Sequence, residues 1–415
     1  MGVFVDAVRK LDDGVDGQVL GFDEYEEDDD HSIVVHFNDD MPTGHLVEAT
    51  PEKAGSVLVL ADSHFLTFRD ITFRGGTGQV VHASAPTENL TFERVSVQQC
   101  SRSGIILLGT DQATHINARF IDCVIDRGWG TYMNVPPVLH AKTLETGGNG
   151  LEFRDSVDGG LVQRVRIVDF GHTALRCFAT GTGRGVRNIT IEECDISAPK
   201  DSYCRAFAFS GVAGHLSGLV FRRNRVHDQH QNSKIGGEDG QYYANLFYGF
   251  YAGTPRGKKV NSGGVSGAFF HADPSPSSFV SRNNLIINNT FFDIEWNALW
   301  AKGDYKPYGN LLKNNLFVAV GQGNDGFALF VSRYFMDNNR VLNNGVWKES
   351  AADAVFSVED KGYTAEAFDR TFENASGNIQ AGPHFVDETL GNPDLHLQQS
   401  SPYARAGLPI TEIPK

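Results

Sequence analysis

A short β-rich phrase returns throughout this chain, and it constrains the fold more than any other feature of the sequence. Each copy is a run of alternating residues that ends in polar residues and continues into a second short run. Examples are LTFRDITF from Leu66, LTFERVSV from Leu90, ITIEECDI from Ile189 and LIINNTFF from Leu285. The phrase recurs every 23 to 31 residues or so, roughly the period of a solenoid repeat. The chain is therefore predicted to form a stack of coils.

A second strand precedes many of these phrases, as in GLEFR from Gly150 and ALWAK from Ala298. Strand side chains alternate between two faces, so each such strand has one inward and one outward set. The set predicted to fill the core is wholly apolar: Leu151, Phe153, Leu175, Cys177, Ala206, Ala208, Ala268, Phe270, Leu299, Ala301, Ala328 and Phe330. The set predicted to point outward is Glu152, Arg154, Arg176, Phe178, Phe207, Phe209, Phe269, His271, Trp300, Lys302, Leu329 and Val331.

Asparagine marks the turn between the two runs of the later phrases. The positions are Asn224, Asn288-Asn289, Asn314-Asn315 and Asn338-Asn339. Asparagine tolerates the left-handed backbone conformation, and its side chain can hydrogen-bond its counterpart in the next coil. These residues are predicted to form a structural ladder. Helical periodicity is nearly absent, apart from a short segment near Ala365 to Phe372.

The order strand, Asn turn, strand and loop, as in LIINNTFFDIEWNALWAK, resembles the pectate-lyase-like superfamily of carbohydrate-active enzymes. The resemblance covers roughly Ser56 to Val346, and the ending DLHLQQSSPYARAGLP is similar to the tail that closes many such proteins. It implies a right-handed parallel β-helix whose groove lies on the outer face of the strand preceding each phrase. No intact pectate-lyase or polygalacturonase motif is present, so the resemblance transfers no catalytic residue.

The fold class expected is therefore all-β, a single-stranded right-handed parallel β-helix of about ten coils with two long loop insertions. Residues 51–346 are predicted to form the β-helix, with 1–50 capping its start and 347–415 capping its end. The two insertions are Gly128 to Asn149 and Asp228 to Gly264. Long irregular loops are usually functional or disordered, and the aromatic content of the second insertion argues against disorder.

The formal net charge of -15 disfavours nonspecific nucleic-acid binding. No stretch is long and apolar enough to span a membrane, and residues 1–17 have no signal-peptide core. We expect a monomer that acts outside the cytoplasm, secreted or periplasmic, in a mature form without its signal peptide. No metal-ligand motif demands a cofactor, although calcium is compatible with the sequence.

Basic and aromatic residues collect on the outward set, which suits an anionic sugar chain. For β-elimination, Lys302 or His271 is the predicted proton acceptor, and Arg176 is predicted to clamp a uronate carboxylate. Tyr242 or Tyr305 is the predicted proton donor. Trp300 is predicted to offer its ring to a sugar. Further substrate contacts are expected from Arg154, Glu152, Lys234, His230, Glu238 and Tyr243.

Two alternatives remain open alongside a polysaccharide lyase. A glycoside hydrolase needs paired carboxyl groups, and the candidates are Asp273, Asp304, Glu152, Asp155, Asp293, Glu295 and Glu238. A noncatalytic glycan-binding or structural β-helix would need only the repeat. Purely structural roles are also open for single residues. Arg176 can simply pair with Glu152, and the aromatic residues of the second insertion can pack over Phe207 and Phe209. The lyase is favoured because of the basic and aromatic column.

Overall fold

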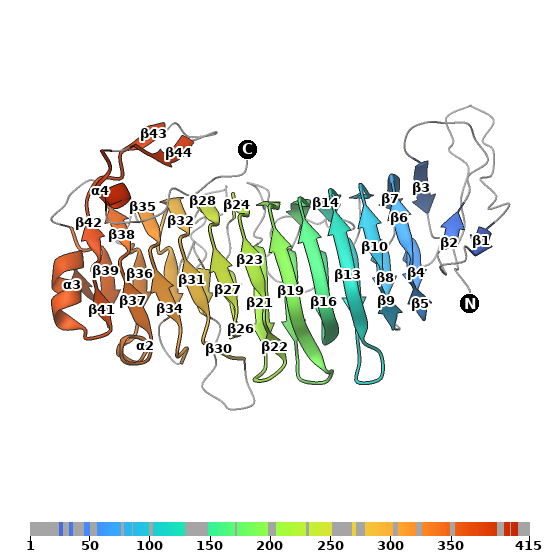
Figure 1. Ribbon diagram of the computed structural model, residues 1–415, viewed down its shortest axis with the longest axis horizontal. Coiled ribbons are helices and arrows are strands. Elements are labelled where there is room, and N and C mark those ends of the chain that lie inside the picture. The colour runs from blue at the N-terminus through green and yellow to red at the C-terminus, as the bar shows by residue number, and fades with distance from the viewer. Residues whose placement is uncertain are drawn as a thin grey trace, which may run out of the picture. The chain divides into compact units, whose positions relative to one another are not determined.

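The computed structural model describes residues 25–27, 33–35, 45–49, 56–75, 79–84, 86–98, 103–128, 148–170, 172–197, 205–229, 232–250, 268–270, 279–301, 306–320, 326–348, 353–387, 394–398 and 400–405. The chain forms two compact units, Met1–Thr190 and Ile191–Lys415. Figure 1 labels the helices and strands of each unit. No helix within these ranges is both long and apolar enough to cross a bilayer.

The first unit consists of three parallel sheets to which successive turns of the chain add one strand each. Sheet 1 contains β4 (Leu58–Leu60), β8 (Val81–Ala83), β12 (Ile105–Leu108), β15 (Asn149–Arg154) and β18 (Thr173–Ala179). Sheet 2 contains β6 (Thr67–Arg69), β10 (Thr91–Glu93), β13 (His115–Ile121) and β16 (Ser156–Gln163), with the short β5 (Ser63–His64) and β9 (Thr87–Glu88). Sheet 3 contains β3 (His45–Ala49), β7 (Ile71–Gly75), β11 (Ser96–Gln98), β14 (Val124–Gly128) and β17 (Arg166–Phe170). A hairpin of β1 (Tyr25–Glu27) and β2 (Ile33–Val35) precedes them.

The second unit repeats this arrangement, and β19 (Gly185–Glu192) leads into it. Its sheet 1 contains β21 (Arg205–Gly211), β25 (Ser233–Ile235), β29 (Ala268–Phe270), β33 (Leu299–Ala301), β36 (Leu329–Val331), β39 (Phe356–Val358) and the antiparallel β40 (Lys361–Tyr363). Its sheet 2 contains β23 (Val220–Arg222), β27 (Gln241–Tyr243), β31 (Leu285–Ile287), β34 (Leu311–Lys313), β37 (Arg340–Leu342) and β41 (Ala375–Ser376), beside β22 (Leu216–Ser217), β26 (Gly237–Glu238) and β30 (Ser281–Arg282). Its sheet 3 contains β20 (Asp195–Ser197), β24 (Arg225–His227), β28 (Leu246–Phe250), β32 (Thr290–Ile294), β35 (Leu316–Val320), β38 (Gly345–Trp347) and β42 (Ile379–Gln380).

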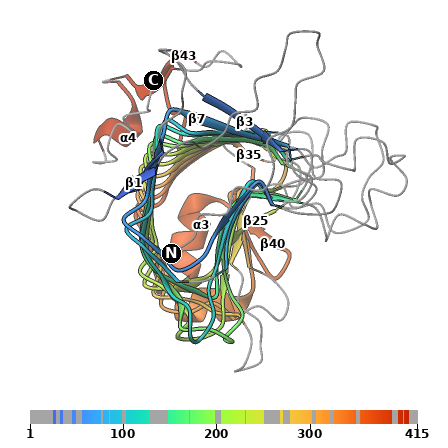
Figure 2. The ribbon, with the colours of Figure 1, turned by 90° about the vertical axis from the view of Figure 1, so that its right-hand side faces the viewer.

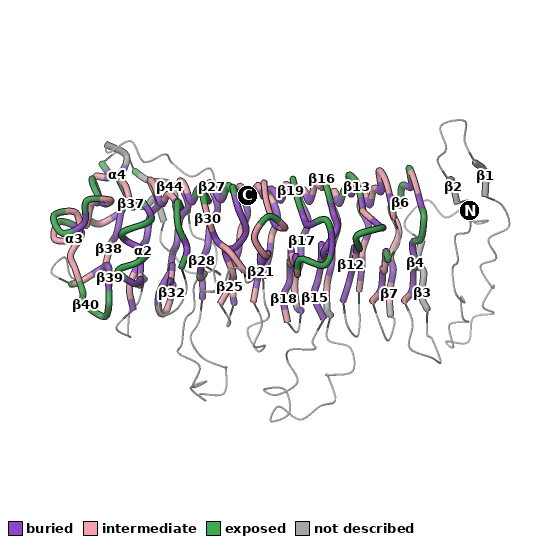
Figure 3. Tube along the Cα trace, turned by 90° about the horizontal axis from the view of Figure 1, so that it is seen from below, coloured by how far each residue is buried: buried purple, intermediate pink, exposed green. Residues whose placement is uncertain are grey.

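These pairings confirm the predicted parallel β-helix in both units. Neighbouring strands lie about 4.8 Å apart, so side chains at paired inward positions can stack on one another. Several of these positions carry the same type of residue. Phe68, Phe92 and Phe120 stack at 5.1 Å in the first unit. Phe291 stacks on its neighbours in the second unit at 4.7 and 4.9 Å. Figure 3 shows burial concentrated in the strands, with exposure at the turns.

Two asparagine ladders confirm the predicted structural role of the turn asparagines, except for Asn338, which lies in a short helix instead. The first runs through Asn224, Asn245, Asn289, Asn315, Asn344 and Asn378 with amide-to-amide distances of 2.9 to 3.1 Å. The second runs through Asn284, Asn310 and Asn339. Asn288 and Asn314, beside the first ladder, have the positive φ that asparagine tolerates. The ladders supply partners for backbone groups that are buried where the chain turns.

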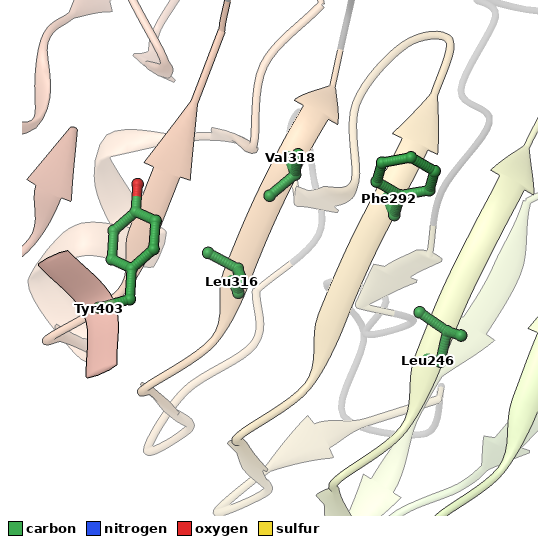
Figure 4. Packing of buried hydrophobic residues seen from close by; sticks show 5 residues of the cluster. All are labelled: Leu246, Phe292, Leu316, Val318 and Tyr403. Carbon is green, nitrogen blue, oxygen red and sulfur yellow. The ribbon is translucent and has the colours of Figure 1, made fainter. Parts of the chain in front are cut away.

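Short helices complete the second unit. The predicted helical segment forms α3 (Ala365–Thr371), which begins after the N-cap Thr364 and buries Phe368 against Phe356 at the end of the coils (Figure 2). A shorter helix, α2 (Arg333–Asn338), follows β36. The last, α4 (Pro402–Arg405), places Tyr403 in an apolar cluster on the outer side of sheet 3 with Leu246, Phe292, Leu316 and Val318 (Figure 4). A hairpin of β43 (Phe385–Asp387) and β44 (Asp394–Leu397) lies between α3 and α4 in sequence.

The predicted division into inward and outward side chains was wrong for two strands. In β21 the rings of Phe207 and Phe209 stack on each other and contact Phe221 of sheet 2, so they face the interior. In β36 the register pairs Phe330 with the outward Trp300, which places Leu329 and Val331 inside. In both strands apolar residues occupy both faces, so alternation could not distinguish them.

The second predicted loop insertion was also wrong in part. Residues 233–250 form strands β25, β26, β27 and β28, which make a further coil of the second unit. Residues 251–267, and 129–147 of the first insertion, lie outside the described residues.

Candidate functional site

The most charge-rich part of the predicted substrate face lies on sheet 1 of the first unit. In β15 and β18, Glu152 pairs in register with Arg176 and Arg154 pairs with Phe178. The alternate residues Leu151, Phe153, Leu175 and Cys177 are fully buried. The predicted division into inward and outward side chains is therefore correct for these two strands. The register places Glu152, Arg154, Arg176 and the Phe178 ring on the outer face.

Glu152 is the centre of this group. Its carboxylate accepts a hydrogen bond from Asn149 Nδ2 at 2.6 Å and another from Arg176 Nη1 at 3.2 Å. Arg154 Nη1 lies 3.9 Å from the same carboxylate. Only 2% of Glu152 is exposed, and a carboxylate that is removed from water needs such partners. The pairing that competed with a functional role for Arg176 is thus present.

The guanidinium of Arg176 is held on two sides. Its Cζ lies 4.0 Å from the centroid of the Phe178 ring, and that of Arg154 lies 5.5 Å from the same centroid. Burial lowers the pKa of Arg176, although the charge of Glu152 opposes this change. Arginine nevertheless remains protonated in proteins, and 20% of this side chain is exposed. Two guanidinium groups therefore share one ring and one carboxylate, and Arg176 keeps part of its surface open to solvent.

Asp155 has a structural role beside this group. Its carboxylate accepts hydrogen bonds from the backbone N–H and the hydroxyl of Thr180, both at 2.7 Å, and Arg154 Nε lies 3.4 Å away. The residue is buried and has a positive φ of 63°. These bonds tie the end of β15 to the turn after β18. They make Asp155 a poor candidate for the acid or base of a hydrolase.

His172 joins this group, a contact the sequence analysis missed. Its Nδ1 lies 2.9 Å from Asn149 Oδ1 and 3.3 Å from the hydroxyl of Thr173. The contact depends on the register that pairs Asn149 with Thr173, across 24 residues of sequence. Aligning GLEFR with ALRCF could have suggested this proximity, but not the hydrogen bonds.

Sheet 1 of the second unit carries two more of the predicted residues. Lys234 pairs with Phe269, and Phe269 pairs with Trp300, so Lys234 and Trp300 occupy equivalent positions of this sheet. Trp300 and Lys234 are partly exposed. The predicted residues His230, His271, Asp273, Lys302, Asp304 and Tyr305 lie outside the described residues.

Three predicted site residues belong instead to sheet 2 and its interior, because residues 233–250 form a coil. Tyr242 is 1% exposed and faces the core, where its ring contacts those of Phe209 and Phe221, so a role as proton donor was wrong. Tyr243 accepts a hydrogen bond from Arg222 at 2.8 Å. Glu238 is buried and forms an ion pair with Arg282 at 2.6 Å. These contacts hold neighbouring coils together and do not place the side chains on the sheet 1 face.

A second polar group lies on the outer side of sheet 3 in the second unit. His227 Nε2 lies 2.9 Å from Asp195 Oδ1, and its Nδ1 lies 2.8 Å from Asp228 Oδ2. The imidazole stacks on Tyr248 at 4.9 Å, and the Tyr248 hydroxyl accepts a hydrogen bond from Arg225 at 2.9 Å. Burial works against the charged imidazole, but the two carboxylates outweigh it and raise the pKa of His227 above 6.5.

This arrangement predicts a pH-dependent contribution to stability. A raised folded-state pKa means that protonated His227 stabilises the fold, fully below about pH 6.5 and less as the pH rises through the folded-state value. The difference in unfolding free energy between the wild type and His227→Gln should therefore be largest in acid and shrink on the alkaline side. Urea titrations across this range measure it. His384→Gln, at an exposed histidine of the same unit, is the control. A difference for His227→Gln that is constant with pH would contradict the prediction.

Metal ligands do not gather in the part of the chain that the structure describes. Within those ranges, no three side chains of His, Cys, Asp or Glu lie together in a way that could hold a metal ion. In the Arg176 group, the guanidinium groups of Arg154 and Arg176 lie beside the carboxylates of Glu152 and Asp155.

Comparison with known proteins found distant structural similarities. The sequence matches no protein-family model and no curated protein. A mannuronic acid specific polysaccharide family 6 lyase from human gut microbiota is similar in structure, with a TM-score of 0.44 and 13% identity over 82% of this chain and 80% of that one. A PL6 family polysaccharide lyase from Pseudopedobacter saltans gives a TM-score of 0.39 and 13% identity over 86% and 92%. The Dettilon tailspike protein gives 0.33 and 10% over 77% and 63%.

Similarity at this level carries no inference about the reaction. The strand pairings of the chain itself establish the architecture, and the chain is a parallel β-helix protein.

Proposed function

We propose that this protein is a glycan-acting enzyme that cleaves a uronate-containing polysaccharide or oligosaccharide by β-elimination. The observation that carries the proposal is the guanidinium of Arg176. It is fixed by Glu152 and Phe178 on the outer face of sheet 1, and part of it is open to solvent. Arg154 adds a second positive charge beside it.

β-Elimination needs a cation at the uronate carboxylate. Removal of the proton next to that carboxylate places negative charge on its oxygens, and a preorganised cation stabilises that charge in the transition state. A guanidinium matches a carboxylate through two parallel N–H donors. Glu152 and the Phe178 ring already hold Arg176 in place. The Arg176 side chain therefore loses little conformational entropy when substrate binds.

The other predicted residues belong to the second unit, and they stand as separate proposals. Trp300, outward and partly exposed in the second unit, is proposed as a surface for a sugar ring. Lys302 and His271 as proton acceptors, and Tyr305 as donor, belong to residues outside the described ranges. A dependence on calcium, a monomeric state and a location outside the cytoplasm are likewise proposals.

The test is a panel of acidic and neutral glycans. The wild type is expected to release unsaturated uronate products from at least one of pectin, alginate, ulvan or a glycosaminoglycan, and their double bond is followed by ultraviolet absorbance. Parallel assays with added calcium and after chelation decide the metal requirement. New reducing ends without the absorbance would contradict β-elimination and indicate a hydrolase. No cleavage of any glycan would indicate a binding or structural protein.

One observation favours the hydrolase as second candidate. Burial raises the pKa of Asp293, and the nearby charge of Glu295 raises it further. Glycosidases use one carboxylic acid with a raised pKa as general acid and a second carboxyl group as base or nucleophile. If the panel shows hydrolysis, Asp293→Asn should abolish it, whereas under the lyase proposal this variant should keep its activity.

A further inference from the structure

The outer face of sheet 2 in the second unit is basic, although the protein as a whole is acidic. In β23, β27, β31, β34 and β37 the alternate residues are buried, and the outward positions carry Arg222, Lys313 and Arg340 but no Asp or Glu. In the first unit, the same sheet instead pairs Arg69 with Glu93 at 2.8 Å. The chain has a formal net charge of -15, so this face is a local concentration of positive charge.

Two tyrosines are exposed beside this face. Tyr308, just before β34, is 39% exposed, and Tyr334 in α2 is 37% exposed. Leu285 of β31 is 36% exposed on the same face. Single apolar side chains are common on protein surfaces, whereas several that gather on one exposed face mark a site of interaction.

Each tyrosine lies against a basic side chain. Lys306 Nζ lies 5.9 Å from the centroid of the Tyr334 ring. Arg282 Nη1 donates a hydrogen bond to the Tyr308 hydroxyl at 3.0 Å. We call these four residues the tyrosine patch. It combines two exposed rings with two cations.

Hydrogen bonds hold the two halves of the tyrosine patch together. Asn339 Nδ2 donates to Pro307 O at 2.8 Å, and Gly309 N donates to Asn338 O at 2.7 Å. These bonds tie residues 306–309 to the end of α2, and Figure 1 shows α2 at the end of β34 and β37. The rings are therefore presented by a fixed backbone, which reduces the entropy lost when a ligand binds.

Carboxylates do not cancel the positive charge of this surface. Glu238 is buried and pairs with Arg282 at 2.6 Å, and Asp337 pairs with Arg333 at 2.9 Å. Asp239 is exposed at the turn before β27 and offsets one further charge. Three basic side chains form no ion pair with any residue that the structure describes: Lys306, Lys313 and Arg340. Positive charge is thus in excess.

We propose that the tyrosine patch and the adjoining face of sheet 2 bind an anionic polysaccharide chain, at a surface of the second unit that is separate from the Arg176 group. A tyrosine ring offers an apolar face to the C–H groups of a sugar, and its hydroxyl remains hydrated at the edge. Lys306, Lys313 and Arg340 attract the carboxylate or sulfate groups of the polymer. The binding does not depend on the β-elimination chemistry. If that chemistry holds, the surface retains the polymer and raises its local concentration at the enzyme.

Affinity electrophoresis through gels that contain alginate, polygalacturonate or neutral dextran tests this proposal. All proteins carry Arg176→Lys, so that cleavage does not consume the polymer. Alginate or polygalacturonate is expected to retard the protein, less so at higher salt, and dextran is not. Lys306→Ala/Tyr334→Ala should weaken the binding by about 10-fold or more. Arg340→Glu, which reverses a charge on the sheet face, should also weaken it.

The matched control is Lys361→Ala, at an exposed lysine that lies 5.2 Å from the Tyr363 ring on β40 of the same unit. It removes a lysine from a tyrosine ring away from the patch and should leave the binding unchanged. Because Lys306, Tyr334 and Arg340 are exposed, the variants are expected to fold, and circular dichroism checks this.

Four results would overturn the inference. They are no retardation by either acidic glycan, full binding by the folded patch variants, an equal loss in Lys361→Ala, and binding of a double-stranded DNA fragment as tight as that of the glycans. Patch-dependent glycan binding by a wild type that cleaves nothing would sink the proposed function and support this inference. Cleavage by a protein whose binding ignores the patch variants would do the reverse.

Discussion

Arg176→Lys is expected to lower kcat/KM on the uronate substrate by about 100- to 1,000-fold, the cost of losing one preorganised donor at a developing negative charge. Lysine keeps the positive charge but lacks the planar pair of donors that matches a carboxylate, and it stacks less well on Phe178. Initial rates across a range of substrate concentrations measure this loss. Arg94→Lys, at an exposed arginine paired with Asp70 in the same unit, is the matched control and should keep wild-type kinetics.

Stability separates the catalytic role of Arg176 from its structural role. Arg176→Ala removes a main partner of the buried Glu152 carboxylate, so the unfolding free energy should fall by about 3–5 kcal/mol. The double variant Glu152→Leu/Arg176→Met removes both charges and should recover most of that stability. It should nevertheless remain inactive, because the guanidinium fixed for the uronate is gone and Arg154 stays beside Asp155. Recovery of activity together with stability would show that Arg176 only supports the fold.

Asn315→Ala is expected to lower the unfolding free energy by about 3–5 kcal/mol, because several buried polar groups would lose their partner together. The Asn315 side chain accepts from the backbone and side-chain N–H groups of Asn289, at 3.0 Å each. It donates to Ile286 O at 2.8 Å and to Asn344 Oδ1 at 3.0 Å. Alanine replaces none of these bonds, and the groups lie inside the coil where water does not replace them.

Urea denaturation followed by circular dichroism measures the loss. Asn338→Ala, at an exposed asparagine outside the ladders, is the control and should change the unfolding free energy by no more than about 0.5 kcal/mol. Equal effects of the two substitutions would contradict the structural role given to the ladder.

The sequence was sufficient to assign side chains to the inner or outer face of a strand where polar and apolar residues alternate without ambiguity. In GLEFR and ALRCF the charged residues can occupy only one face, so Glu152, Arg154 and Arg176 were assigned to the outside, as the structure has them. The asparagine turns were equally clear, since asparagine combines tolerance of positive φ with a side chain that can bridge coils.

The sequence was insufficient to assign side chains to a face where both faces of a strand are apolar. It was also insufficient to recognise strands that are very short. RAFAFSG offers alanine to one face and phenylalanine to the other, and only packing against Phe221 decides between them. Strands β25, β26 and β27 have two or three residues each. Such strands carry too little alternation to be told from an aromatic loop, so a coil was missed and Tyr242 was placed outside.

The amino-acid sequence by itself determined that this protein is a stack of parallel coils with charged residues on one outer face, because a repeated local pattern is enough to specify a repeated local structure. Only the tertiary structure decided which side chains meet there. Hydrogen bonds join His172, Asn149, Glu152 and Arg176, and they depend on the register of two neighbouring strands. Hydrogen bonds of about 3 Å depend on that register to within a single residue.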